Sequence, residues 1–514
     1  MKKNNDLQSA NFKRRTFLKG AALSAAAIIT GKSFAQMHDM HNMDHGSMDH
    51  GDGNATAQAD TKKMRMIDGQ LFPEAKFPQD QALPALNSLK NQSTVSGQFV
   101  AHLQAKPASV ELVPDLKTIF WAYNGQVPGP LIEVYEGDTL TITFQNDLPQ
   151  ASTIHWHGLP VPPDQDGNPQ DEVKSGQSRV YTFTLPQGCA GTYWYHPHGH
   201  ETVAEQAFRG LAGALIVRAK QDPLAHIPEQ NWLISDLKLD EQGQIADNTM
   251  IDWMNGREGQ FVLINGAYKP QINLDQATRV RVWNACSGRY LKLALADATV
   301  YLIGTDGGLL EEIVEIEDLL LTPGERAQLL IIPKKTGSVY LQSLAYDRGK
   351  MGPVGVEPTR NLAKVNLKLS TMPTIPTKLR DLPKYANAKS IKKLEYTETM
   401  EMGSGMNFFI NGKQHDMARV DLTSKVGELE EWIIFNNSHM DHNFHIHGEQ
   451  FKVIDFELNG KLSVPIAALK DTVNLKPYET VRLHILQTHK GLRMYHCHIL
   501  EHETLGMMGQ LEVI

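Results

Sequence analysis

The sequence is poor in cysteine, in long apolar runs and in net positive charge. Three cysteines among 514 residues are too few for a scaffold that is held together by disulfides. No apolar run approaches the roughly 20 residues that a membrane-spanning helix needs, so we expect no stable membrane insertion. A formal net charge of −8 argues against nucleic acid as a partner, because phosphate backbones attract basic surfaces.

Long helical periodicity is also scarce, and the chain has the character of β-structure from about residue 75 onward. Segments such as 139–146, 180–185 and 279–284 alternate apolar with polar residues or contain β-branched runs. Glycine, proline, asparagine and aspartate interrupt these segments at short intervals, as expected at turns. The sequence therefore predicts an all-β fold.

One pattern occurs three times along the chain. An Asn-Gly pair begins at Asn124, Asn265 and Asn411, and each pair precedes a strand-like run that ends in asparagine. The three pairs lie 141 and 146 residues apart. Repeats of this length indicate three β-domains of one kind, because solenoid repeats are much shorter. The proline-rich segment 371–390 is interpreted as the linker before the third domain. The predicted domains are 75–220, 221–375 and 376–514.

The first 35 residues have the composition of a targeting segment. Arg14 and Arg15 stand before a short apolar region, which ends in Ser-Phe-Ala at 33–35. This order is typical of a twin-arginine export signal, and the alternative is a disordered basic tail. We therefore expect the twin-arginine export machinery as a partner and the periplasm as the location.

Residues 36–74 are predicted to be a flexible segment rich in methionine and histidine. Within it, residues 37–51 contain four methionines, four histidines and three aspartates. No core can form from such residues, whereas thioether and imidazole groups bind soft metal ions. We interpret the segment as metal-gathering, and the alternative is a merely soluble linker.

Four His-x-His pairs carry the strongest chemical signal. Residues two apart on a strand point to the same side, so each pair can present two imidazoles together. A single pair would fit a core or a surface equally well. Eight imidazoles in four facing pairs can hold three metal ions and leave positions for a small ligand. The pairs are His155/His157, His196/His198, His445/His447 and His496/His498.

Cys497 stands between the two histidines of the last pair. In an extended chain its side chain points away from His496 and His498, so it can bind a separate metal ion. His442, His502 and Met507 are candidate partners for the thiolate. Two histidines, one cysteine and a distant methionine are the ligand set of a blue-copper site.

With these motifs the chain resembles the multicopper oxidase family. The motifs "HWHG", "WYHPHGH", "HNFHIHG" and "HCHILEHETLGMM" are similar to the copper motifs of that family in order and spacing. The resemblance covers residues 75–514. It implies three consecutive cupredoxin-like Greek-key β-barrel domains, with a copper cluster between the first and the third. The middle domain has no ligand motif and is expected to be a structural spacer.

The resemblance also implies four copper ions and assigns residues to them. The type 1 copper would be held by His442, Cys497, His502 and Met507. The type 2 copper would be held by His155 and His445. The type 3 pair would be held by His157, His196, His198, His447, His496 and His498. Asp166 and Glu503 are similar to the proton-supplying carboxylates of the family, and the alternative for each is an ordinary solvated side chain.

The implied reaction couples one-electron oxidation of a reductant to the four-electron reduction of dioxygen to water. We expect Cu(I) as a main reductant, as in periplasmic cuprous oxidases that detoxify copper. Met351, Met440 and Asp441 are candidate ligands of a substrate copper ion, because thioethers favour Cu(I). Many such enzymes carry a long methionine-rich insertion near the type 1 copper. In this chain the candidate region for that insertion, residues 345–360, contains a single methionine, Met351.

Two other functions stay open at this point. One is a laccase-like oxidase of phenols or aromatic amines, because a missing methionine-rich cover would leave the type 1 site open to bulky molecules. The other is a non-catalytic copper-binding or structural protein on the same fold. A monomer is expected in each case.

Cys189 and Cys286 are the two cysteines outside the copper motifs. They lie near strand ends in the first and second repeats, so a disulfide between these domains is predicted. The alternative is a pair of free buried thiols, since cysteine is commonly buried as a small apolar residue.

Overall fold

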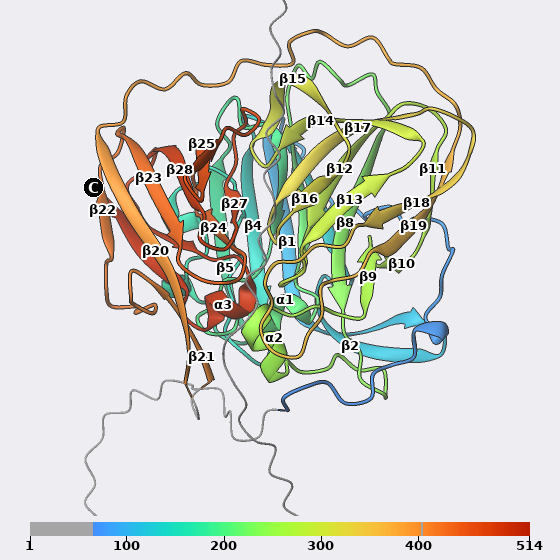
Figure 1. Cartoon of the computed structure of the whole chain (residues 1–514), viewed down its shortest axis with the longest axis horizontal. Coiled ribbons are helices and arrows are strands. Elements are labelled where there is room, and N and C mark those ends of the chain that lie inside the picture. The colour runs from blue at the N-terminus through green and yellow to red at the C-terminus, as the bar shows by residue number, and fades with distance from the viewer. Residues whose placement is uncertain (1–64, 402–404) are drawn as a thin grey trace, which may run out of the picture. The chain divides into compact units, whose positions relative to one another are not determined.

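A computed structural model describes residues 65–401 and 405–514. In this part of the chain the strands form six β-sheets, and the α-helices are three short ones (Figure 1). The predicted all-β class is confirmed. The predicted export signal 1–35 and the methionine-rich stretch 37–51 lie outside the described residues. No helix of the described residues is both long and apolar enough to cross a membrane.

Two sheets formed by residues 98–218 enclose the first core. One has the order β2-β1-β4-β5, with β1 (Gln98–Val113), β2 (Leu116–Tyr123), β4 (Thr139–Asn146) and β5 (Gln177–Thr184). The other has the order β3-β7-β6, with β3 (Gly129–Tyr135), β6 (Gly191–Tyr195) and β7 (Gly213–Arg218). Strand β4 alternates as predicted, because Leu140, Ile142 and Phe144 are fully buried between more exposed residues.

The middle of the chain forms a second pair of sheets, one of seven strands and one of five. The seven-stranded sheet has the order β10-β9-β8-β12-β17-β14-β15. Its strands are β8 (Glu229–Leu237), β9 (Phe261–Ile264), β10 (Ala267–Tyr268), β12 (Thr278–Asn284), β14 (Ala298–Thr305), β15 (Gly308–Ile316) and β17 (Arg326–Pro333). The five-stranded sheet has the order β11-β19-β18-β13-β16. Its strands are β11 (Gln271–Leu274), β13 (Leu291–Leu295), β16 (Leu319–Leu321), β18 (Gly337–Ser343) and β19 (Arg360–Leu367).

Strands β12 and β17 are buried along their whole length. One face, with Val280 and Val282, packs into the core of the middle domain. The other face meets the first domain, where Trp283 packs in one apolar cluster with Trp194. Strands that are covered on both faces are mostly apolar, so the three buried arginines on these strands, Arg279, Arg281 and Arg326, need buried partners.

The last part of the chain again forms two sheets. The six-stranded sheet has the order β21-β20-β23-β28-β25-β26. Its strands are β20 (Ser390–Glu401), β21 (Gly405–Ile410), β23 (Leu429–Asn436), β25 (Phe451–Leu458), β26 (Lys461–Ser463) and β28 (Thr480–Leu486). The five-stranded sheet has the order β22-β30-β29-β24-β27. Its strands are β22 (Leu422–Ser424), β24 (His442–Ile446), β27 (Thr472–Leu475), β29 (Gly491–His496) and β30 (Met508–Val513).

Three pairs of sheets thus follow one another along the chain, as the three repeats predict. The predicted boundaries after residues 220 and 375 fall between β7 and β8 and between β19 and β20, and their exact positions stay predictions. The short helices are α1 (Val203–Phe208), α2 (Met250–Asn255) and α3 (Leu500–Thr504). The 3-10 helices are η2 (Glu74–Lys76), η3 (Pro163–Gln165) and η4 (Pro169–Asp171).

Helix α3 lies where all three domains meet, beside α1 and α2 (Figure 1). Leu500 packs against Val203 and Ala204 of α1. The backbone N–H of Leu500 donates to the carbonyl oxygen of Ser287 in the middle domain at 3.1 Å. This helix carries residues of both predicted metal centres.

Candidate metal centre

The eight histidines of the His-x-His pairs come together in the fold. His155 and His196 form an antiparallel bridge in the first domain, and His445 and His496 are register partners on β24 and β29 in the third. Each domain therefore presents its two pairs side by side. All eight side chains are completely buried, which a set of surface histidines would not be.

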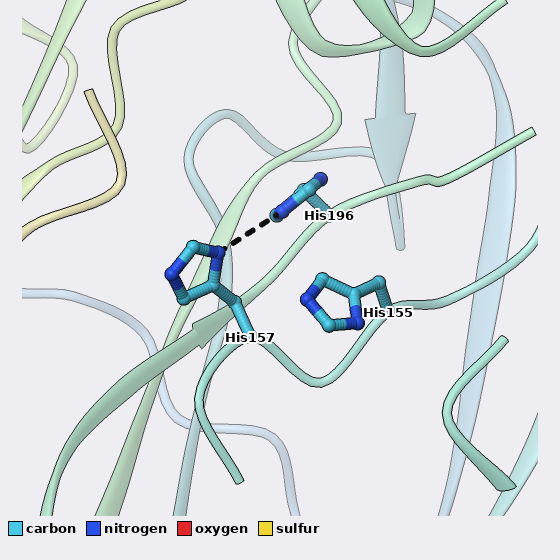
Figure 2. Close-up of side chains that lie close together, drawn as sticks. All are labelled: His155, His157 and His196. Carbon is cyan, nitrogen blue, oxygen red and sulfur yellow. Dashed lines mark hydrogen bonds between the residues drawn. The ribbon is translucent and has the colours of Figure 1, made fainter. Parts of the chain in front are cut away.

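Their ring nitrogens approach one another in three groups. The Nδ1 atom of His157 is 3.4 Å from Nε2 of His196 (Figure 2). The same Nε2 atom of His196 is 3.4 Å from Nε2 of His498. The Nε2 atom of His496 is 3.3 Å from Nε2 of His198 and 3.1 Å from Nε2 of His447. The remaining pair, His155 and His445, has its Nε2 atoms 3.3 Å apart.

The ring nitrogens of the cluster are arranged to bind a cation, because their lone pairs converge instead of forming hydrogen bonds with one another. Backbone carbonyl oxygens accept from Nδ1 of His196 at 2.8 Å, of His445 at 2.8 Å and of His496 at 3.1 Å. Each of these rings therefore carries its proton on Nδ1 and turns an Nε2 lone pair inward. Lone pairs that converge in a buried space repel one another unless a metal ion lies between them.

The protonation of the rings agrees with ligation. Burial, followed by the neighbouring histidines, lowers the pKa well below its ordinary value, so the rings are neutral at neutral pH. Neutral imidazole is the form that binds metal. This lowered pKa applies to His157, His196, His198, His445, His447 and His498.

The two predicted carboxylates both lie against the cluster. Asp166, at the end of η3, has one oxygen 3.0 Å from Nδ1 of His155 and the other 3.2 Å from Nδ1 of His447. Glu503 on α3 lies 3.0 Å from Nε2 of His198 and 3.1 Å from Nδ1 of His496. Burial opposes the charge of Glu503, but these two histidines outweigh it and lower its pKa. Both carboxylates are almost fully buried, so neither is an ordinary solvated side chain.

A third carboxylate at the cluster was not predicted. Asp471 Oδ1 lies 3.1 Å from Nε2 of His157, and the backbone oxygen of Asp471 is the acceptor for His445. Arg326 of the middle domain binds both oxygens of Asp471. No motif surrounds Asp471 in the sequence, and its only signal is a position directly before the buried strand β27.

The second predicted centre also assembles. Cys497 Sγ lies 3.6 Å from Nδ1 of His442 and 3.9 Å from Nδ1 of His502, and the two nitrogens are 3.2 Å apart. His502 donates from Nε2 to the carbonyl oxygen of Met254 at 3.2 Å, which leaves Nδ1 as the ligand atom. Phe408 stacks on the His502 ring with centroids 3.9 Å apart.

Met507 lies in the same core as Cys497 and is fully buried. Its backbone oxygen accepts from the Cys497 N–H at 3.1 Å, whereas Met508 begins β30. Asn443 links the two centres, because its Oδ1 lies 3.4 Å from Cys497 Sγ and accepts from the His498 N–H at 2.6 Å. Met507 as axial ligand stays a prediction.

A short relay leads from the surface to His442. Glu398 on β20 has one oxygen 3.4 Å from Nε2 of His442 and the other 2.7 Å from Nδ1 of His439. The side chain of His439 is 49% exposed, whereas that of Glu398 is 6% exposed. Burial opposes the charge of His442, but hydrogen bonds with Cys497 and Glu398 outweigh it and raise its pKa to about 9.

Methionines that the sequence reasoning missed lie beside this relay. Met400 and Met406 are direct register partners on β20 and β21. Met400 is 61% exposed, whereas Met406 is 5% exposed and packs in the third core. A Cβ atom at Gly405 would be 3.9 Å from Sδ of Met250 on α2. Figure 1 shows the paired ends of β20 and β21 near α2 and α3. The sequence signal was the methionine spacing in "TMEMGSGMN", of which residues 402–404 lie outside the described residues.

The predicted substrate ligands Met440 and Asp441 need correction. Met440 is completely buried, and Asp441 is 1% exposed. Asp441 accepts from the Tyr346 hydroxyl at 2.6 Å and from the Asn474 amide at 2.8 Å, so its oxygens already have partners. An ion arriving from solvent would meet neither residue. Met351 is partly buried and packs at the edge of the third core.

The predicted disulfide is also wrong, because Cys189 and Cys286 are both free thiols. Cys189 packs in the core of the first domain, whereas Cys286 Sγ lies 3.9 Å from the carbonyl oxygen of Ile234 in the second. Burial raises the pKa of Cys189 to about 12 and that of Cys286 well above its ordinary value. Both behave as small apolar side chains.

The two donor sets suit one metal. The ligand atoms of His198, His447 and His496 lie within 4.8 Å of one another, and so do those of His442, Cys497 and His502. Imidazole alone suits several transition metals, but two imidazoles with a thiolate in a buried core are typical of copper that transfers electrons. The residues present therefore fit copper at both centres.

Comparison with known proteins agrees with this geometry. Two family models described as multicopper oxidase match residues 104–222 and 384–514. The chain is 32% identical over 402 residues to a multicopper oxidase of Staphylococcus aureus, across 76% of this chain and 83% of that protein. The chain belongs to the multicopper oxidase family. This multicopper oxidase is accordingly an oxidoreductase with copper as cofactor, and dioxygen and a reductant fit its family.

Solved structures extend the comparison to the fold. A structure described as a multicopper oxidase from Campylobacter jejuni, a metallo-oxidase, has a TM-score of 0.84 and 48% identity, covering 88% of this chain and 98% of that one. Among the relatives found by sequence alone, a laccase of Bacillus subtilis is 27% identical over 508 residues, which cover 84% of this chain and 98% of that protein. The cupredoxin-like fold predicted for this multicopper oxidase is confirmed.

Proposed function

We propose that this multicopper oxidase binds four copper ions, oxidises Cu(I) and reduces dioxygen to water. Bound copper would supply one-electron transfer at the Cys497 centre and dioxygen reduction at the eight-histidine cluster. The type 1 ion would be held by His442, Cys497, His502 and Met507. The cluster contacts support His155 and His445 for the type 2 ion. They support His157, His196 and His498 for one type 3 ion and His198, His447 and His496 for the other.

The residues between the centres form a short covalent path. Cys497 is directly bonded in the chain to His496 and His498, which belong to different type 3 groups. Asn443 adds a hydrogen-bonded connection through its contacts with Cys497 and His498. This arrangement supports Cys497 as the residue through which electrons leave the first centre.

Two carboxylates are proposed to handle protons at the cluster. Glu503 lies within hydrogen-bonding distance of His198 and His496 and would deliver protons toward dioxygen from its Oε atoms. Asp166 would hold the Nδ1 protons of His155 and His447 and so keep both Nε2 lone pairs turned inward.

The proposal of Cu(I) as substrate rests on the exposed thioether of Met400 beside the relay to His442, with the buried thioether of Met406 packed beneath it. Met400 and Met406 face each other across β20 and β21, and residues at even positions of β20 share one face, so Glu398 lies on the same side. Thioether sulfur favours Cu(I), which is a soft ion. An ion held there would lie next to Glu398 and His439, from which a route of two contacts leads to His442.

Oxygen uptake by the copper-loaded protein tests the substrate. We expect fast uptake with Cu(I), and uptake with a bulky phenol only when Cu(II) is added as a mediator. The double variant M400L/M406L keeps the side-chain volume but removes both sulfurs, so the KM for Cu(I) should rise at least about tenfold. M372L is the matched control, since Met372 is 44% exposed and contacts neither centre. Wild-type KM in M400L/M406L would contradict the role of these residues.

A laccase-type oxidation of phenols is the second candidate. Residues 345–360 contain a single methionine, and one relative is named a laccase. Fast phenol oxidation without added copper, together with slow Cu(I) oxidation, would favour this function over cuprous oxidation.

We further propose export to the periplasm through the twin-arginine pathway. The support is the order of Arg14, Arg15, an apolar region and a small-x-small site in the first 35 residues. Replacing both arginines with lysine should keep the uncleaved protein in the cytoplasm, which fractionation and immunoblotting would measure. Normal processing and export of R14K/R15K would contradict this proposal.

A further inference from the structure

The middle domain reaches the histidine cluster, although it was expected to be a spacer. The loop between β16 and β17 contains Gly324, which has a φ of +89°. A Cβ atom at this position would lie 3.1 Å from Cε1 of His157 and 3.1 Å from Cγ of His498. The backbone of the middle domain is therefore part of the wall around the cluster, and only glycine fits there without displacing a ring.

Arg326, two residues later, joins the three domains through one side chain. Its Nη1 and Nη2 donate to the two carboxylate oxygens of Asp471, each at 2.6 Å. Its Nε donates to the carbonyl oxygen of Thr192 on β6 at 2.8 Å. Arg326 is 1% exposed, and a two-pronged ion pair in such a buried place is both strong and directional.

Asp471 transmits this orientation to two histidines of the cluster. Its Oδ1 lies 3.1 Å from Nε2 of His157, so the Nδ1 of that ring faces His196. Its backbone oxygen accepts from Nδ1 of His445, so the Nε2 of that ring faces His155. Turning the Asp471 carboxylate would therefore release His157, and a shift of the Asp471 backbone would release His445.

Further charged residues surround the ion pair of Arg326 and Asp471. The Arg326 N–H donates to Asp306 at 2.7 Å, and Lys470 lies 3.0 Å from Asp306 and 2.9 Å from Glu325. Each buried charge thus has a partner of opposite sign, which a buried ionic network requires. The charged residues of this network come from the second and third domains, and Asp471 is the one that contacts the histidine rings.

We propose that Arg326 is a positioning residue of the copper cluster, acting through Asp471 on His157 and His445. The middle domain is then a working part of the metal centre. This inference rests on the proposed copper binding of the cluster. A lysine at position 326 would keep the charge but lose the planar fork that binds both carboxylate oxygens.

Arg281 offers a matched control. It is also buried, with 2% exposure, lies on β12 of the same sheet and donates to Thr192 Oγ1 at 2.7 Å. It pairs with Glu229 at 2.9 Å and does not touch Asp471. R281M therefore removes an equivalent arginine from the same interface while it leaves the cluster contacts intact.

The test compares R326M, R326K and R281M in the full-length, copper-loaded protein. We expect R326M to release cluster copper to a chelator about 10–100 times more readily and to change the type 2 electron paramagnetic resonance spectrum. The visible absorption of the type 1 centre should persist. R326K should recover the spectrum only in part, and R281M should match the wild type in both measurements.

Two results would overturn the inference. One is wild-type copper retention and a wild-type type 2 spectrum in R326M. If R326M does not fold, the same two wild-type readings in R326K would overturn it instead. A wild-type protein that binds no copper at the cluster would contradict the proposed function itself, so the two failures can be told apart.

Discussion

Replacement of Cys497 with serine is expected to abolish oxidation of every reductant. Serine stays protonated and is a poor ligand for copper, so the type 1 centre and its visible absorption should disappear. Changing a residue that only supports a ligand costs about 10–100-fold in activity, so losing the ligand itself should cost more than about 100-fold. Stopped-flow reduction and oxygen uptake would measure the loss.

The histidine cluster should survive this change. Its rings are held by Asp166, Glu503 and Asp471, and none of these contacts involves the thiol. C286S is the control, because Cys286 is an equally buried thiol that lies in the second domain and should cost only about 1–2 kcal/mol of stability. Appreciable turnover in C497S with an intact cluster would contradict the proposed electron path.

The variant D166N should lower the turnover number about 10–100-fold while the type 1 absorption stays unchanged. One oxygen of Asp166 lies 3.0 Å from Nδ1 of His155 and the other lies 3.2 Å from Nδ1 of His447. An amide of the same shape can accept on one side only, because its NH2 group donates. One of the two rings must therefore lose its partner, and a type 2 or a type 3 ligand turns.

Turnover at saturating reductant and the type 2 spectrum would measure this effect. D164N is the matched control, since Asp164 lies on the same turn, η3, but is exposed. A D166N enzyme with wild-type turnover and an unchanged spectrum would show that Asp166 neither orients these rings nor supplies protons.

The clustering of the eight histidines could be predicted from sequence because the His-x-His pattern repeats at short spacing. His-x-His on a strand places both rings on one side, whatever the rest of the fold does. The alternation in β4 is local in the same way, since Leu140, Ile142 and Phe144 face one core. These features need no knowledge of which distant segments meet.

The supporting residues could not be predicted for the opposite reason. Arg326 and Asp471 are 145 residues apart in the chain, and nothing near either one marks the pair. In the sequence, Glu398 cannot be told from any other glutamate on a polar strand, because only the folded position of β20 brings it beside His442. The error at Met440 has the same origin, because Met440 stands two residues before the candidate ligand His442 while its own side chain is completely buried.

Helix α3 has a consequence for how the protein can be divided. Its five residues contain His502 of one centre and Glu503 of the other, and it packs against α1 of the first domain and α2 of the second. The cluster takes its histidines from the first and third domains and part of its wall from the second. None of the three domains therefore contains the complete histidine cluster with its wall, so we expect that no single domain, produced alone, would form this metal centre.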